Sequence, residues 1–161
     1  MERKIIYKLR QWKDNPQRKP LILLGARQVG KTWIMKHFGE TDFENVAYIN
    51  CDAEPMAKEL FAADYDIDRL LLMLQAITGT KIEAGKTLII LDELQEVERG
   101  MHSLKYFYDN APEYHVIAAG SLLEAKTRCM CGVQGRRSIF LHPAFISNGP
   151  MANRFKSTNS I

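Results

Sequence analysis

Short apolar runs alternate with amphipathic segments along the first 120 residues of the chain. Four short segments, residues 21–24, 46–50, 87–91 and 115–119, have the length and apolar content of buried strands. Segments with apolar residues at helical spacing separate them. Strands that alternate with helices predict an α/β fold with a parallel sheet and right-handed crossovers.

The first of the predicted helices lies near the N-terminus. Ile5, Leu9 and Trp12 recur at helical spacing between basic and polar residues, and Pro16 and Pro20 end the pattern. A second helix is expected over residues 33–38, with Gly39 as its C-terminal cap. We also expect a helix over about residues 55–63.

Two further amphipathic helices follow. One is expected to begin near Asp66 and to end at Gly79, and we interpret its apolar stripe as a face that packs in the core. That stripe contains Ile67, Leu70, Leu71, Leu74 and Ile77. The other spans residues 101–111 and is stopped by Pro112.

The pattern changes after about residue 128, where prolines are scattered and the end of the chain is polar. Only residues 138–141 suggest a fifth strand there. The sequence therefore predicts an N-terminal helix at 1–19, an α/β core at 20–127, and an atypical, partly disordered tail at 128–161.

Composition restricts the function classes only mildly. The chain has 161 residues, of which 46% are hydrophobic and 25% charged, as in an ordinary globular domain. The formal net charge of +3 supports neither a nucleic acid nor a membrane as partner. We find no pattern typical of a signal peptide or a membrane span, so we expect a cytoplasmic protein. The three cysteines, Cys51, Cys129 and Cys131, fit reduced thiols better than a disulfide framework or a zinc site.

The segment between the first strand and the second predicted helix carries the strongest chemical signal. It fits the pattern G-x-x-x-x-G-K-[ST], the P-loop, in the strand–loop–helix setting that this motif requires. Its backbone N–H groups would surround the phosphates of ATP, Lys31 would reach the β- and γ-phosphates, and the Thr32 hydroxyl would ligate Mg²⁺. The alternative is a glycine-rich turn with an incidental lysine. The predicted nucleotide-binding residues are Gly25, Ala26, Arg27, Gln28, Val29, Gly30, Lys31 and Thr32.

Two acidic residues end the strand at 87–91. Asp92 is predicted to hold the Mg²⁺ ion together with Thr32, and Glu93 to orient and deprotonate the attacking water. The alternative is that the two acids only cap the next helix. Gln95, just after them, is interpreted as a residue at the start of that helix.

Three further positions leave alternatives open. Ser121, at the end of the strand at 115–119, either contacts the γ-phosphate or the water as a catalytic residue, or caps a helix in a capping box with Glu124. Arg27 lies either near the phosphates or on the surface. Arg136 and Arg137 are interpreted as a solvated basic pair, with arginine fingers toward a neighbouring subunit's site as the alternative.

Several stretches of the sequence resemble the AAA-type ATPases that carry an ATP-binding core and a C-terminal domain of unknown function, DUF4143. The similar segments are residues 24–32, 64–69, 87–95, 104–107 and 114–123, and the resemblance extends over about residues 1–124. The resemblance implies a three-layer α/β/α domain with an additional-strand sheet of ASCE type, in which the strand ending at Ser121 lies between the other two site strands.

The resemblance also implies a longer protein than this one. We therefore expect that the helical lid and the C-terminal domain are missing, as in a truncated or frame-shifted product. The leading hypothesis is an Mg²⁺-dependent ATPase, and the alternative is a catalytically impaired ATP-binding module. A GTPase is disfavoured because Asp-x-x-Gly and Asn-Lys-x-Asp are absent. ATP is the predicted ligand, and a homo-oligomer or an unidentified protein partner stays open.

Overall fold

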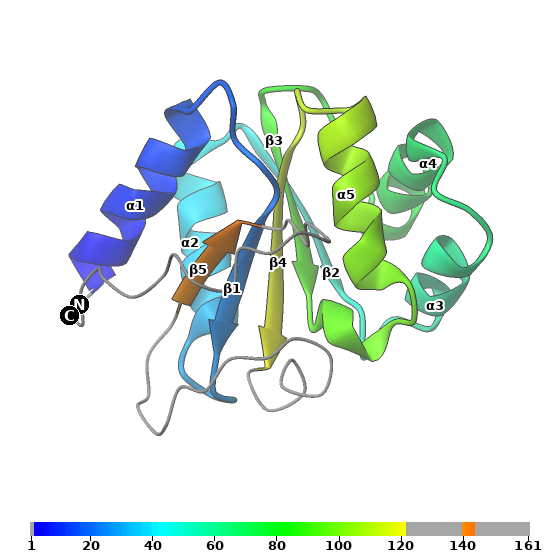
Figure 1. The fold of residues 1–161 in the computed structure, drawn as a ribbon, viewed down its shortest axis with the longest axis horizontal. Coiled ribbons are helices and arrows are strands. Elements are labelled where there is room, and N and C mark those ends of the chain that lie inside the picture. Colours follow the sequence, from blue (N-terminus) through cyan, green and yellow to red (C-terminus); the bar gives the residue numbers. More distant parts are fainter. Residues whose placement is uncertain (1, 122–139, 144–161) are drawn as a thin grey trace, which may run out of the picture.

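A single mixed sheet organises the chain in the computed structural model, which describes residues 2–121 and 140–143. The strand order is β2-β3-β4-β1-β5, and the first four strands in this order are parallel, while β5 runs antiparallel to β1 (Figure 1). The strands are β1 (Leu21–Gly25), β2 (Asn45–Asn50), β3 (Thr87–Asp92), β4 (His115–Ser121) and β5 (Phe140–Pro143). The predicted position of β4 between β1 and β3 is thereby confirmed.

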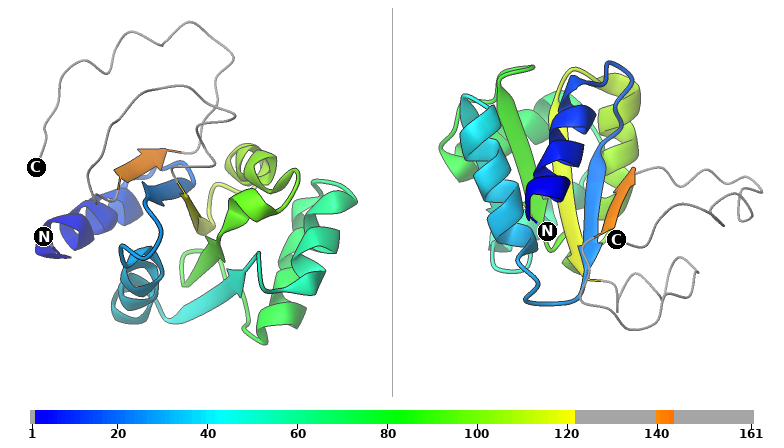
Figure 2. Two further views of the ribbon diagram at one scale, coloured as in Figure 1. Left: turned by 90° about the horizontal axis from the view of Figure 1, so that it is seen from below. Right: turned by 90° about the vertical axis from the view of Figure 1, so that its left-hand side faces the viewer.

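Helices cover both faces of the sheet, which confirms the predicted three-layer α/β/α fold. Figure 2 shows α1 and α2 on one face and α3, α4 and α5 on the other. The helices are α1 (Glu2–Asp14), α2 (Lys31–Asp42), α3 (Pro55–Ala62), α4 (Ile67–Thr78) and α5 (Gly100–Asn110), with a short 3₁₀ helix, η1 (Leu94–Glu96). None of the helices in the described residues is long and apolar enough to cross a lipid bilayer.

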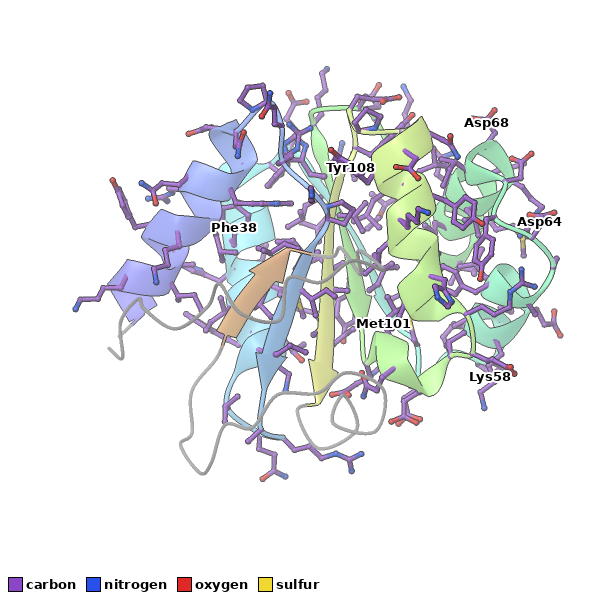
Figure 3. All side chains as sticks on the ribbon, viewed as in Figure 1. Phe38, Lys58, Asp64, Asp68, Met101 and Tyr108 are labelled. Carbon is purple, nitrogen blue, oxygen red and sulfur yellow. The ribbon has the colours of Figure 1, made fainter. Side chains whose placement is uncertain are left out.

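Two separate cores form because alternate residues of each strand point to opposite faces of the sheet. In β3, Ile89 and Leu91 pack toward α3, α4 and α5, whereas Leu88 and Ile90 pack toward α1 and α2. Phe38 of α2 is fully buried in the second core (Figure 3). Side chains on both faces of β3 are buried, which explains why this segment is a continuous apolar run rather than an alternating one.

The predicted ends of α4 are confirmed, and both have a clear cause. The side chain of Asp66 accepts a hydrogen bond from the backbone N–H of Arg69 at 2.9 Å and caps the N-terminus. Gly79 ends the helix with φ of +66°, in the left-handed region that favours glycine. The apolar stripe between them packs into the core, as expected.

The predicted role of Gly39 was wrong. This glycine lies inside α2, which continues to Asp42 and is capped by Phe43. Gly39 is buried against β2, and a Cβ atom built on it would lie 2.6 Å from Cγ2 of Val46. The glycine is therefore needed for the close approach of helix and strand, a packing requirement that resembles a helix stop in the sequence.

The fifth strand exists but lies two residues further along than predicted, at Phe140–Pro143 instead of 138–141. It pairs with β1 and places Leu141 beside Leu23. The rest of the predicted tail, and its predicted disorder, lie outside the described residues.

His115, at the start of β4, is a buried polar side chain between α1 and the segment after α2. Its ring makes edge-on contacts with Trp12 and Phe43, and Nε2 donates to the carbonyl oxygen of Lys13 at 3.3 Å. Within the described residues, Nδ1 has no hydrogen-bond partner. Burial, reinforced by the positive charge of Arg18, lowers the pKa of His115 to about 4.

We predict that Gly39→Ala destabilises the domain, although alanine favours a helix interior over glycine by about 1 kcal/mol. The new methyl group would overlap Val46, whose β-branched side chain yields poorly, so a net loss of about 1–3 kcal/mol in the free energy of unfolding is expected. Urea titration measures it. Glu40→Ala, at the exposed neighbouring position, should change little, and adding Val46→Ala to Gly39→Ala should reduce the loss attributable to the glycine. A stabilised Gly39→Ala protein would contradict the packing argument.

A second prediction concerns acid stability. Because the pKa of His115 is lower in the folded than in the unfolded chain, its contribution to stability is complete above about pH 6.5 and is lost as the pH falls toward 4. The loss should be on the order of 1–2 kcal/mol, since solvent near the start of the strand screens part of the effect. His115→Phe should remove this component of the pH dependence in urea titrations, whereas His102→Phe at an exposed position should retain it. Identical pH profiles for both variants would refute the assignment.

Candidate functional site

Three strand ends meet at one edge of the sheet. Gly25 ends β1, Asp92 ends β3 and Ser121 ends β4, and the backbone of Ser121 lies in register with Gly25 (Figure 1). Since β4 runs between β1 and β3, the loop after β1 and the acids after β3 lie on either side of it. Ligands of open α/β sheets bind beyond this edge, where strand ends and the following helices meet.

The predicted P-loop connects β1 to α2. Gly30 has φ of +89° and occupies the N-cap position of α2, and Gln28 also has a positive φ, of +62°. Such left-handed positions next to ordinary ones turn successive N–H groups toward the same side of a loop. Gly25 is buried, Ala26 and Val29 are half-buried, and Gln28 and Gly30 are exposed. The loop therefore begins inside the sheet and exposes its turn at the surface.

Lys31, the first residue of α2, folds back toward the start of the loop. It is only 5% exposed, and its Nζ donates to the carbonyl oxygens of Gly25 at 3.1 Å and Ala26 at 2.9 Å. An ammonium that is buried this deeply needs hydrogen-bond acceptors. The positive charge is thus fixed at the tip of β1, within the turn of the loop.

Asp92 is the most highly connected group of the site. It is 2% exposed, and its Oδ2 accepts hydrogen bonds from Thr32 Oγ1 at 2.6 Å and from Tyr48 Oη at 3.1 Å. Its Oδ1 accepts from the backbone N–H of Glu93 at 3.1 Å. The two residues predicted to share a metal ion, Thr32 and Asp92, are thus brought together from elements 60 residues apart.

Tyr48 is a site residue that the sequence analysis missed. In the β2–β3 register it pairs with Ile90, so Asp92 is its diagonal neighbour on the same face, within reach of a long side chain. Burial and the negative charge of Asp92 raise the pKa of Tyr48 to about 12, which keeps the phenol protonated as a donor. Lys36 of α2 lies over the ring, 3.7 Å from its centre. Knowledge of the strand register would have identified this residue.

Glu93 turns the chain from β3 into η1. It has a positive φ of +51° and occupies the N-cap position of η1, but its side chain makes no capping hydrogen bond there. Its Oε2 instead accepts from Nε2 of Gln95 at 2.5 Å. The alternative that this acid only caps the next helix is therefore not supported.

Cys51 directly follows β2 and lies close to Asp92 and Glu93. Its side chain is fully buried, and burial followed by the charges of Asp92 and Glu93 raises the pKa of its thiol to about 12. Such a thiol stays protonated at neutral pH and is a poor nucleophile. Cys129 and Cys131 lie outside the described residues.

The remaining predicted residues divide into two groups. The side chain of Arg27 is 64% exposed and its guanidinium lies 4.0 Å from a carboxylate oxygen of Glu96, so of the two alternatives the structure favours the surface. The side chain of Ser121 lies outside the described part of the chain. The same holds for the whole of Glu124, Arg136 and Arg137.

No cluster of three or more histidine, cysteine, aspartate or glutamate side chains able to hold a metal by themselves occurs in residues 2–121 and 140–143. Thr32 and Asp92 instead bring one hydroxyl and one carboxylate oxygen into contact at the site. Magnesium is commonly bound by one or two such protein ligands, with phosphate and water completing its shell.

A parallel sheet that carries a P-loop with a buried lysine on one strand, and an aspartate bonded to the P-loop threonine on another, defines a P-loop nucleotide-binding domain. A family model described as an AAA domain matches residues 17–144, which is most of the chain. The chain belongs to this AAA family, and its P-loop is therefore that of an AAA-type ATPase domain. No curated protein matches the sequence.

We predict that Tyr48→Phe lowers the free energy of unfolding by about 1–2 kcal/mol, because it removes a hydrogen bond to a buried carboxylate and leaves the shape of the ring unchanged. Tyr7→Phe, at a side chain that is 63% exposed, is the matched control and should have no effect. In a double-mutant cycle with Asp92→Asn, the effect of Tyr48→Phe should shrink. Equal effects in both backgrounds would contradict the contact.

Proposed function

We propose that this chain binds ATP together with Mg²⁺ and hydrolyses its terminal phosphate. One observation carries the proposal: the Thr32 hydroxyl is hydrogen-bonded to Asp92 at 2.6 Å, while the ammonium of the neighbouring Lys31 is buried against the carbonyl oxygens of Gly25 and Ala26. A hydroxyl, a carboxylate and an ammonium fixed at one edge of a parallel sheet are the protein groups that a magnesium-bound triphosphate requires.

The phosphates are held by the loop from Gly25 to Thr32. Its N–H groups and the N-terminus of α2, a helix of 12 residues, provide partial positive charge. Lys31 exchanges its carbonyl partners for phosphate oxygens and supplies the full positive charge. Arg27 contributes its backbone N–H, while its side chain faces solvent and Glu96.

Thr32, in the first turn of α2, and Asp92, at the end of β3, fit a magnesium ion, because a hydroxyl and a carboxylate are hard oxygen donors. The Thr32 hydroxyl and the Asp92 carboxylate would hold the ion. A magnesium ion bound there would neutralise the charge that develops on the phosphate oxygens. Tyr48 and the backbone N–H of Glu93 keep the Asp92 carboxylate in place.

Hydrolysis needs a base for the attacking water, and Glu93 takes this role. The water oxygen forms a bond to the γ-phosphorus, while the bond between that phosphorus and the oxygen bridging to the β-phosphate breaks. The bonding electron pair leaves with ADP, and Glu93 accepts the proton that the water loses. Ser121, at the tip of β4 beside Gly25, is assigned to the γ-phosphate or the water.

The resemblance to ATPases associated with DUF4143 belongs to this proposal. It rests on sequence stretches, above all on the acidic pair with a glutamine two residues later, Asp92-Glu93-Leu94-Gln95. A module that binds ATP without turnover is the competing function. The two are separated by the experiment below.

Binding and turnover should respond to different residues. Lys31→Ala is expected to weaken binding of ATP by about 100-fold or more, because it removes the ammonium from the loop. Glu93→Gln should leave binding within about twofold of wild type and lower kcat by about 10²–10⁴-fold, because it removes the base. Calorimetric titration with Mg·ATP measures the first effect and single-turnover hydrolysis the second.

Two substitutions on α3 serve as controls, Lys58→Ala and Glu59→Gln, since both side chains are exposed and Lys58 points away from the domain (Figure 3). Both should match the wild type. A folded wild-type protein that gives no heat with Mg·ATP would overturn the proposal as a whole. Binding without single turnover would establish the competing module, and unchanged turnover in Glu93→Gln would remove Glu93 from the mechanism.

A further inference from the structure

Gln95 is the polar side chain that joins the acid Glu93 to the tip of β4. It lies in η1, the short 3₁₀ helix after β3, and its amide packs against Gly120 near the end of β4. A Cβ atom on Gly120 would lie 3.2 Å from Oε1 of Gln95 and 3.6 Å from Cδ2 of Leu24. The amide is therefore seated where β4 has no side chain.

The amide holds one oxygen of the proposed base. Nε2 of Gln95 donates to Oε2 of Glu93 at 2.5 Å, and the same nitrogen lies 3.4 Å from Oε1 of Glu96. A hydrogen bond from an amide to a carboxylate is charge-assisted and orients the carboxylate. With Oε2 engaged, Oε1 of Glu93 remains as the oxygen that can accept a proton.

The other end of the amide argues against a role in packing alone. Oε1 of Gln95 is buried and has no hydrogen-bond partner in the described part of the chain. A buried oxygen without a partner is destabilising, and a methionine would fill the same length and volume without it. Filling space against Gly120 therefore does not account for a glutamine, whereas donating to Glu93 does.

The backbone at this point supports the same conclusion. Glu93 has a positive φ, which is uncommon for a side chain with a Cβ atom, and η1 follows it directly. The turn brings residues 93 and 95 onto the same side, close enough for the two side chains to meet. The strained residue and its partner thus form one unit at the end of β3.

We propose that Gln95 is the positioning residue of the hydrolytic reaction: it fixes the carboxylate of Glu93, and Gly120 keeps the space that its amide needs. The inference rests on the function proposed above. Gln95 itself need not touch ATP or water, since it acts through Glu93.

Gln95→Met tests the proposal, because it removes the donor and preserves length and bulk. We expect kcat for ATP hydrolysis to fall by about 10–100-fold, while KM and the dissociation constant for Mg·ATP stay within about twofold. The urea midpoint should be unchanged or higher, since the unpaired oxygen is also removed. Gln11→Met, at an exposed position of α1, is the matched control and should behave as wild type.

Gly120→Ala is a second, independent approach to the same contact. Its new methyl group would press on Oε1 of Gln95, so kcat should fall by about 3–10-fold with binding preserved. In a Gln95→Ala background there is no amide to displace, so the same substitution should have a smaller effect on kcat. Equal effects in the two backgrounds would contradict a role for Gly120 through Gln95.

The outcomes separate this proposal from the one on which it rests. If the wild type does not hydrolyse ATP, or if Glu93→Gln is fully active, the proposed function fails whatever Gln95 does. If the wild type is active and depends on Glu93, but Gln95→Met retains wild-type kcat, the positioning role fails alone. A fall in kcat accompanied by a lower urea midpoint and weaker ATP binding would assign Gln95 a structural role instead.

Discussion

The carboxylate of Asp92 is the group on which the site depends. It is buried at the end of β3, so its charge must be satisfied by donors from the protein, and three elements supply them: Thr32 from the start of α2, Tyr48 from β2, and the backbone of Glu93. Thr32 and Glu93 are themselves predicted site residues, and Tyr48 lies beside them. A single electrostatic requirement thereby connects the P-loop helix, the outer strand and the turn that carries Glu93.

The sequence predicted the fold well because its signals are local. Continuous apolar runs identified the parallel strands, and the cap and stop residues of α4, Asp66 and Gly79, act through contacts within a few residues. The prediction that Gly39 caps α2 was wrong for the same reason. The sequence alone does not distinguish a glycine that ends a helix from one that makes room for a neighbouring strand, here at Val46. The predicted bounds of the fifth strand were two residues too early, since this edge strand has no strong pattern of apolar residues.

The site was predicted in part. The P-loop pattern and the acidic pair are contiguous motifs, so their residues could be named in advance, and the structure brings Thr32 and Asp92 into contact. The roles of Glu93 and Ser121 stay predictions. Tyr48 could not be found, because its place depends on how β2 pairs with β3. Gln95 could be noted in the sequence, but its hydrogen bond to Glu93 depends on the positive φ of Glu93. No glycine or asparagine at that position indicates such a turn.

The tight contact between α2 and β2 at Gly39 has a mechanical consequence. Since a Cβ atom on Gly39 would already overlap Val46, α2 cannot slide over β2 without a steric clash. The loop that would receive the phosphates leads directly into α2, and Tyr48 belongs to β2. A displacement of the loop along α2 would therefore press on β2, the outer strand that carries Tyr48.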